Sequence, residues 1–139
     1  MTRGGIDHEG LGANYITIEA DATLKATVLA AGGATTADGK AAAVGKAVTR
    51  TDNKTAGFGS AGDPLLGRVD VYDNDGMMTV QDKGYTGFTG VSGNLPTYNE
   101  IVVVDGNGAI MASSGAVGSA RCDYTLTTSA TGPVMVDLG

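Results

Sequence analysis

Glycine divides this sequence into short segments that suit β-strands joined by tight turns better than long helices. There are 23 glycines among 139 residues, more than twice the roughly 7% of average usage, and they follow no three-residue collagen period. Between them, apolar and polar residues alternate, as in YITIEA, where Ile16 and Ile18 share one face, and in RCDYTLTT and GPVMVDLG near the end. Such short segments, separated by turn residues, predict an all-β domain that forms a barrel or a sandwich.

The stretch VYDNDGMM, residues 71–78, is similar to the start of a calcium loop, but its ligand pattern is incomplete. A helix-flanked calcium loop needs an oxygen ligand at its first position and a bidentate glutamate at its twelfth. With the loop glycine at Gly76, these positions fall on Val71 and Asp82, and the flanking residues show no helical stripe. We therefore expect no metal-ligating residues here.

A β-hairpin is the alternative for the same stretch. In that register DNDG is a four-residue loop that pairs Val71 with Met78 and Val69 with Val80, and Gly76 takes the left-handed conformation at its end. A DGNG loop later in the chain, within IVVVDGNGAIMA, predicts a second hairpin.

The second hairpin would place Val104 opposite Ala109, and the next pairs would follow in step. A third pair of short strands is expected around the DNKT turn in VGKAVTRTDNKTAGFG. LKATVLA alternates as a strand does, although its Ala and Leu content leaves a short helix open. Residues 31–43 are small and low in complexity and predict a loop.

Residues 1–14 are polar, punctuated by glycine and without periodicity, so they are interpreted as an N-terminal arm before a single β-domain at 15–139. The formal net charge of −6 and the scattered Lys and Arg argue against a nucleic-acid partner. The longest aliphatic run is IVVV and the N-terminus has no apolar signal core, so we expect neither a membrane role nor secretion by a signal peptide. With Cys122 as the one cysteine, no intramolecular disulfide is possible.

Catalytic chemistry finds little support in the residues. His8 is the one histidine, and it lies in the glycine-rich arm, where a solvent-exposed role is expected. Cys122 alternates with apolar neighbours and is expected to be a buried small hydrophobe. Carboxylate pairs such as Asp73 with Asp75 are interpreted as turn residues, and GFGSAGD lacks the strand and helix of a phosphate-binding loop. We expect no enzyme activity, no catalytic residues and no cofactor.

Two longer stretches carry a family pattern: AVGKAVTRTDNKTAGFGSAGDPLLGRVDVYDNDGMMTVQDKGYTGFTG and LPTYNEIVVVDGNGAI. They combine a GKAV strand, a GDPLLGRV segment that leads into an acidic hairpin, a TVQDKG return strand and a later hairpin in EIVVVDGNG. In this pattern the chain resembles the small capsid cement or head decoration proteins of tailed bacteriophages. The match covers residues 40–112 and the terminal strand.

The resemblance implies a compact β-barrel or β-tulip-like domain of short antiparallel strands with an extended N-terminal arm. It also implies a homotrimer on the outer surface of the virion capsid, at three-fold and quasi-three-fold positions, made in the host cytoplasm. There the protein would bridge neighbouring major capsid subunits and brace the shell, without nucleic acid, membrane or cofactor as a partner.

In related decoration proteins the N-terminal segment engages the shell, so the resemblance implies a capsid contact by the arm. The residues expected to make it are Thr2, Arg3, Ile6, Asp7, His8, Leu11 and Tyr15. Such an arm would order on contact, either by adding a strand to a sheet edge or by laying Ile6 and Leu11 into a groove.

A second function stays open, namely a carbohydrate- or receptor-binding β module of a phage tail or fibre, which would also be all-β, glycine-rich and trimeric. An exposed aromatic cluster would favour it, and Tyr85, Phe88 and Tyr98 lie in one turn-rich stretch. We expect these three rings to plug the end of the barrel instead.

Overall fold

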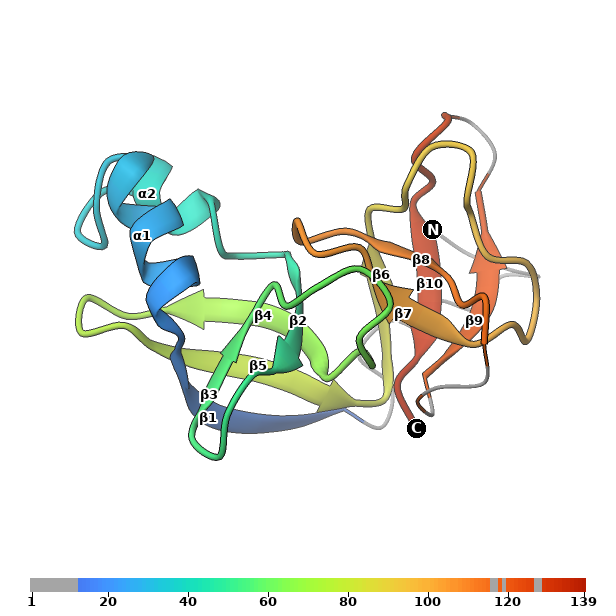
Figure 1. Cartoon of the computed structure of the whole chain (residues 1–139), viewed down its shortest axis with the longest axis horizontal. Coiled ribbons are helices and arrows are strands. Elements are labelled where there is room, and N and C mark those ends of the chain that lie inside the picture. Colours follow the sequence, from blue (N-terminus) through green and yellow to red (C-terminus); the bar gives the residue numbers. More distant parts are fainter. Residues whose placement is uncertain (1–12, 116–117, 119, 127–128) are drawn as a thin grey trace.

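A closed five-strand barrel forms the first part of the fold in the computed structural model, which describes residues 13–115, 118, 120–126 and 129–139 (Figure 1). Its strands are β1 (Asn14–Ala20), β2 (Ala47–Arg50), β3 (Thr55–Gly57), β4 (Gly67–Tyr72) and β5 (Met77–Lys83). They follow the order β1-β3-β2-β4-β5, and every neighbouring pair is antiparallel except the parallel pair of β1 and β3. The predicted all-β fold is confirmed, with one parallel pairing that the sequence did not indicate.

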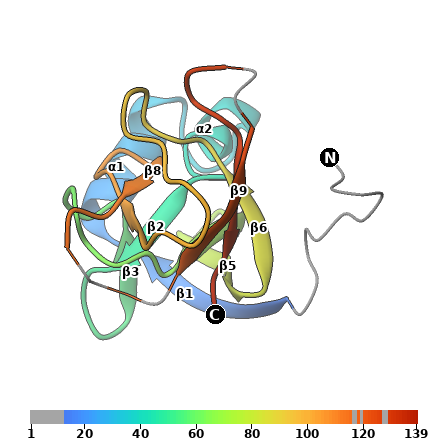
Figure 2. The same ribbon diagram turned by 90° about the vertical axis from the view of Figure 1, so that its right-hand side faces the viewer.

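Two smaller sheets complete the β structure on the other side of the molecule. One is three-stranded, in the order β6-β10-β9, and the other pairs β7 with β8. Their bounds are β6 (Tyr85–Phe88), β7 (Val102–Val104), β8 (Ile110–Ala112), β9 (Arg121–Thr125) and β10 (Val134–Asp137). Figure 2 looks onto the end of the molecule that carries β6 and β9.

Two clusters of buried side chains hold these parts together. The barrel cluster contains the inward-facing residues of YITIEA, β4 and β5, such as Ile18, Val69 and Val80. The second cluster lies among the smaller sheets and contains Val102, Ile110 and Val136, among others. Most of these side chains are Val or Ala, as expected for a narrow five-strand barrel whose interior has little room.

A nine-residue helix, α1 (Ala22–Ala30), covers one end of the barrel (Figure 1). It contains LKATVLA, for which the sequence left both a strand and a short helix open. Asp21 caps it, because its Oδ1 accepts a hydrogen bond from the backbone N–H of Leu24 at 2.8 Å. Leu24 and Val28, one turn apart, are buried in the barrel cluster, whereas Leu29 is 74% exposed. The helix prevails because its i, i+4 face fills the barrel end.

The prediction of a loop at residues 31–43 is wrong in part, because this stretch contains a second helix of five residues, α2 (Ala37–Ala41). Thr36 caps this helix by accepting from the N–H of Gly39 at 3.0 Å. A Cβ on Gly39 would lie 1.8 Å from the carbonyl oxygen of Gly33, so glycine is required for this close approach.

The β4–β5 hairpin forms as predicted, but a bulge shifts the strand pairing on the side nearer the loop. Val69 lies opposite Val80, as expected, and Gly76 is left-handed with φ 86°. Between Val69 and Val71 the register shifts, so Val71 faces Thr79 and the predicted Val71–Met78 pair is wrong. The extra residue turns the next side chain, Tyr72, into the barrel and leaves Val71 45% exposed.

The β7–β8 hairpin is also confirmed, but its register is one residue off the prediction. Val104 lies opposite Ile110, so the loop has five residues and the predicted Val104–Ala109 pair is wrong. The Oδ1 of Asp105 explains the longer loop, because it accepts from the N–H groups of Asn107 at 2.7 Å and Ala109 at 2.9 Å. The predicted β2–β3 pair is confirmed as well.

Leu24→Ala tests how much the packing of α1 contributes to the barrel. We expect this change to lower the free energy of unfolding by about 2–5 kcal/mol, because it empties a fully buried site in the barrel cluster. Leu29→Ala is the matched control on the same helix and should cost less than about 0.5 kcal/mol. Urea unfolding followed by circular dichroism measures both, and equal losses would contradict the packing described here.

Candidate functional site

The surface at the start of β1 holds the one predicted contact residue that the structure describes. Tyr15 lies in β1, opposite Gln81 of β5, and is 50% exposed. The other predicted contact residues, Thr2, Arg3, Ile6, Asp7, His8 and Leu11, lie outside the described residues. β1 begins at Asn14, so the last residue assigned to the arm belongs to the barrel sheet.

β1 pairs with β5 along most of its length, but it pairs with β3 only at its C-terminal end. It pairs with β5 from Asn14 to Glu19, but with β3 only at Glu19 and Ala20. Glu19 donates its N–H toward the β3 side, to the carbonyl of Lys54, and Ala20 donates toward the β5 side. Because strand backbone groups alternate in direction, those of Thr17 also face the β3 side, where no described strand pairs with them. This half of β1 is an open sheet edge that could accept a further strand.

A surface hollow of about 510 Å³ lies beside this open edge. Ile16 of β1 and Met77 of β5 give it an apolar part, and both are half-buried. Arg50 and Lys54, from the two ends of the β2–β3 turn, bring positive charge to it. No motif in the sequence marks these lining residues, because barrel closure brings them together from three separate segments.

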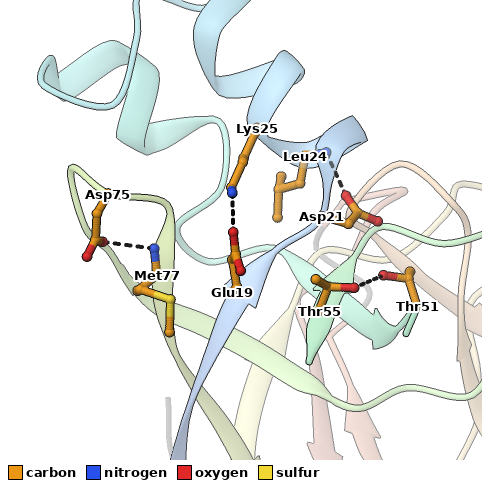
Figure 3. A network of polar contacts seen from close by, with 8 residues as sticks. All are labelled: Glu19, Asp21, Leu24, Lys25, Thr51, Thr55, Asp75 and Met77. Atoms are coloured by element: carbon orange, nitrogen blue, oxygen red, sulfur yellow. Dashed lines mark hydrogen bonds and ion pairs between the residues drawn. The ribbon is translucent and has the colours of Figure 1, made fainter. Parts of the chain in front are cut away.

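Figure 3 shows the polar contacts that fix this end of the barrel. Lys25 of α1 forms an ion pair with Glu19 of β1, and the hydrogen bond from Lys25 to that carboxylate is the main cause of its raised pKa. The Thr51 and Thr55 hydroxyls lie 3.2 Å apart across the β2–β3 turn. The ion pair joins the helix to β1, and the N–H of Glu19, which donates to the carbonyl of Lys54, joins β1 to the turn beside the hollow.

In the acidic loop between β4 and β5, the carboxylate of Asp75 stabilises the turn by accepting a backbone hydrogen bond. Asp75 Oδ1 accepts from the N–H of Met77 at 3.0 Å (Figure 3). Gly76 donates its N–H to the carbonyl of Asp73 at 3.0 Å. Across the part of the chain that the structure describes, no group of three His, Cys, Asp or Glu side chains could hold a metal ion.

Cys122 is buried in the second cluster, as predicted. Burial is the main reason why the pKa of its thiol is raised, and its Sγ lies 3.4 Å from Thr125 Oγ1. Such a thiol stays protonated at neutral pH and is a poor nucleophile.

The three rings do not gather at the end of the barrel: Tyr85 and Tyr98 line one surface pocket, and Phe88 lies apart from it. Phe88 is buried in the second cluster instead of the barrel cluster, and Tyr98 is 78% exposed. The prediction that these rings plug the barrel is therefore wrong, because β6 and the loop after it belong to the smaller sheets.

Searches against protein-family models, curated proteins and solved structures found no match to this chain. Among the described helices, none has the length and apolar character needed to cross a membrane.

Calcium and its removal should both leave the protein's thermal stability unchanged. Met77 already donates to Asp75, and Val71 offers no side-chain oxygen at the first loop position. We expect Tm to stay within about 1 °C in excess CaCl₂ and in excess EDTA, because only a ligand that binds the native state shifts Tm. A rise with calcium that EDTA reverses would overturn the turn interpretation.

Cys122 should resist modification until the protein unfolds. Because the thiol is buried and its pKa is raised, we expect the native protein to react with Ellman's reagent at least about tenfold more slowly than the protein in concentrated urea. Equal rates in the two conditions would show that the second cluster opens readily.

Proposed function

We propose that this protein is a structural component of a bacteriophage virion that binds the outer surface of the capsid and stabilises contacts between major capsid subunits. The observation that carries the proposal is the position of the family-like segments in the fold. GKAV leads into β2, GRV and TVQDKG form the two arms of the β4–β5 hairpin, and EIVVVDGNG forms β7 and its loop. Three of these segments thus lie in the barrel, in β2, β4 and β5, and the fourth lies in β7 of the two-stranded sheet.

The packing of the chain supports an assembled protein. Its buried residues divide into two clusters that are built mainly from Val and Ala, and the sequence contains no Trp. Small cores leave a small margin of stability, which association with identical copies or with a shell increases. We propose a homotrimer on the capsid, made in the host cytoplasm and without a cofactor.

The proposed capsid contact combines the N-terminal segment with the start of β1. Residues 1–14 lead into the open half-edge of β1, where Tyr15 is half exposed and the hollow offers Arg50 and Lys54. An extended capsid segment with acidic side chains would suit this surface, because backbone pairing gives affinity and charge gives selectivity. The function of the contact is to join subunits of the shell that would otherwise separate under internal pressure.

A second candidate function is a carbohydrate- or receptor-binding module of a tail or fibre. One observation favours it, the exposed Tyr98 at the rim of a small polar pocket. Binding to immobilised glycans together with no binding to heads would select this candidate.

Deleting residues 2–12 tests the proposed contact. We expect Tm to change by less than about 2 °C, because terminal segments contribute little to a folded core, while binding to heads that lack the protein is lost. The measurement is co-sedimentation with heads assembled from the major capsid protein of the same phage. Leu29→Ala, an exposed change on α1, is the control and should bind as the unaltered protein does.

If the shortened protein binds heads with unchanged affinity, the arm is not the contact. The capsid would then be bound by loops of the β-domain.

A further inference from the structure

A row of polar side chains crosses the three-stranded sheet at its outer face. Asp137 at the end of β10 lies opposite Tyr85 of β6 on one side and Arg121 of β9 on the other. Residues that face each other across neighbouring strands project on the same side of a sheet. An acid, a cation and a phenol therefore stand side by side.

The neighbouring row explains why these polar side chains face outward. Val136 lies opposite Thr86 and Cys122, and all three are buried. Successive strand residues alternate between the two faces of a sheet. Because Val136 and its two partners face the second cluster, the side chains of Asp137, Tyr85 and Arg121 face away from that cluster. Their outward position follows from the apolar pattern of GPVMVDLG and the second core.

The segment before β7 forms a wall over this row. Asn99 has a left-handed backbone with φ 65°, its N–H donates to the carbonyl of Cys122 at 2.7 Å, and its carbonyl accepts from Arg121 Nη1 at 3.0 Å. Two residues before Asn99, the N–H of Thr97 donates to a carboxylate oxygen of Glu100 at 2.7 Å. These bonds hold the wall firmly while Tyr98 projects into solvent.

Together these groups enclose a pocket of about 200 Å³, the most polar of the described hollows. Its lining includes Tyr85, Tyr98, Asn99, Arg121, Asp123 and Asp137. Asp137 Oδ1 also accepts from the N–H of Gly139 at 3.0 Å, which fixes the orientation of that carboxylate. The pocket is smaller than the roughly 300–1,000 Å³ of sites for drug-sized ligands, so it suits a single small ring.

The lining selects among ligand classes by charge and shape. The carboxylates of Asp123 and Asp137 disfavour an anion, and the guanidinium of Arg121 offsets part of their attraction for a cation, so a neutral ligand is the class that we test. A carboxylate accepts a hydrogen bond from one hydroxyl and a neighbouring guanidinium donates to the next, which matches the adjacent hydroxyls of a sugar. The flat face of Tyr98 offers an apolar surface for the C–H side of the same ring.

We propose that this pocket binds one neutral hexopyranose unit of a surface glycan, with Tyr98 stacking on the ring and Asp137 and Arg121 bonding to neighbouring hydroxyls. The site is independent of the capsid contact proposed above, because it needs neither the N-terminal segment nor a partner chain. A protein displayed on a particle would gain from it a weak attachment to glycan-bearing surfaces, strengthened by many copies.

Titration of the ¹⁵N-labelled full chain with the methyl glycosides of glucose, galactose, mannose and N-acetylglucosamine tests the proposal. We expect at least one of them to shift the amide signals of Tyr98, Asn99, Arg121 and Asp137 with a millimolar Kd, which is typical of weak single-ring contacts. Tetramethylammonium chloride and sodium sulfate serve as cationic and anionic probes and should shift none of these signals.

Three variants separate stacking from general surface effects. Tyr98→Ala should weaken glycoside binding at least about tenfold, whereas Tyr98→Phe keeps the ring and should bind within about twofold of the unaltered protein. Leu29→Ala, an exposed change on α1 outside the pocket, should leave glycoside binding unchanged. Because Tyr98 and Leu29 are both largely exposed, neither change threatens the fold.

The proposal is overturned if none of the four glycosides shifts these signals in the millimolar range. It is also overturned if the cationic or the anionic probe binds there in preference to the sugars, or if Tyr98→Ala binds as well as the unaltered protein. The capsid proposal is unaffected by any of these results, because its test is the co-sedimentation of the shortened chain.

Discussion

The closure of five short strands on a narrow interior is the constraint on which the rest of this structure depends. β1 closes the ring by pairing with β5 along most of its length and with β3 at only two positions. The interior that results is filled mainly by Val and Ala, together with Ile18, Tyr72 and Met78, and one end has to be filled from outside the sheet. Leu24 and Val28 of α1 fill it, and the Lys25–Glu19 ion pair fixes the helix to the strand that closes the ring.

β2 links the barrel to the smaller sheets because both of its faces are buried. Ala47 belongs to the second cluster and its neighbour Val48 to the barrel cluster, so one strand serves two cores. The N–H of Ala47 donates to the carbonyl of Gly108, in the loop between β7 and β8, at 2.8 Å. A strand buried on both faces couples the two clusters, and we infer that they unfold together.

Local patterns in the sequence predict the all-β class and most of the strands, but they do not predict β6, whose residues lie in a stretch expected to be rich in turns, or the helix α2. YITIEA, GPVMVDLG and the D-x-x-G loops all predicted elements that the structure contains. Three details depended on interactions that short windows do not contain. The bulge after Val69 places Tyr72 in the barrel, the Asp105 carboxylate lengthens its loop, and α1 forms because the barrel end needs filling.

The candidate surfaces were harder to predict than the fold for the same reason. Arg50, Lys54 and Met77 meet at the hollow only after the ring has closed, and Arg121, Asp137 and Tyr85 align only after β6, β9 and β10 have paired. No short motif marks either group. Tyr98 was noticed in the sequence, but its exposure depends on the left-handed turn at Asn99, which asparagine allows and which a sequence pattern does not disclose.

Cryo-microscopy of heads saturated with the purified protein tests the proposed capsid role. We expect a trimer of this fold on the outer surface at three-fold and quasi-three-fold positions, with the start of β1 facing the shell and contacting more than one major capsid subunit. Heads of the same phage that carry no added density at saturating protein, or that carry isolated single copies touching one subunit each, would contradict it.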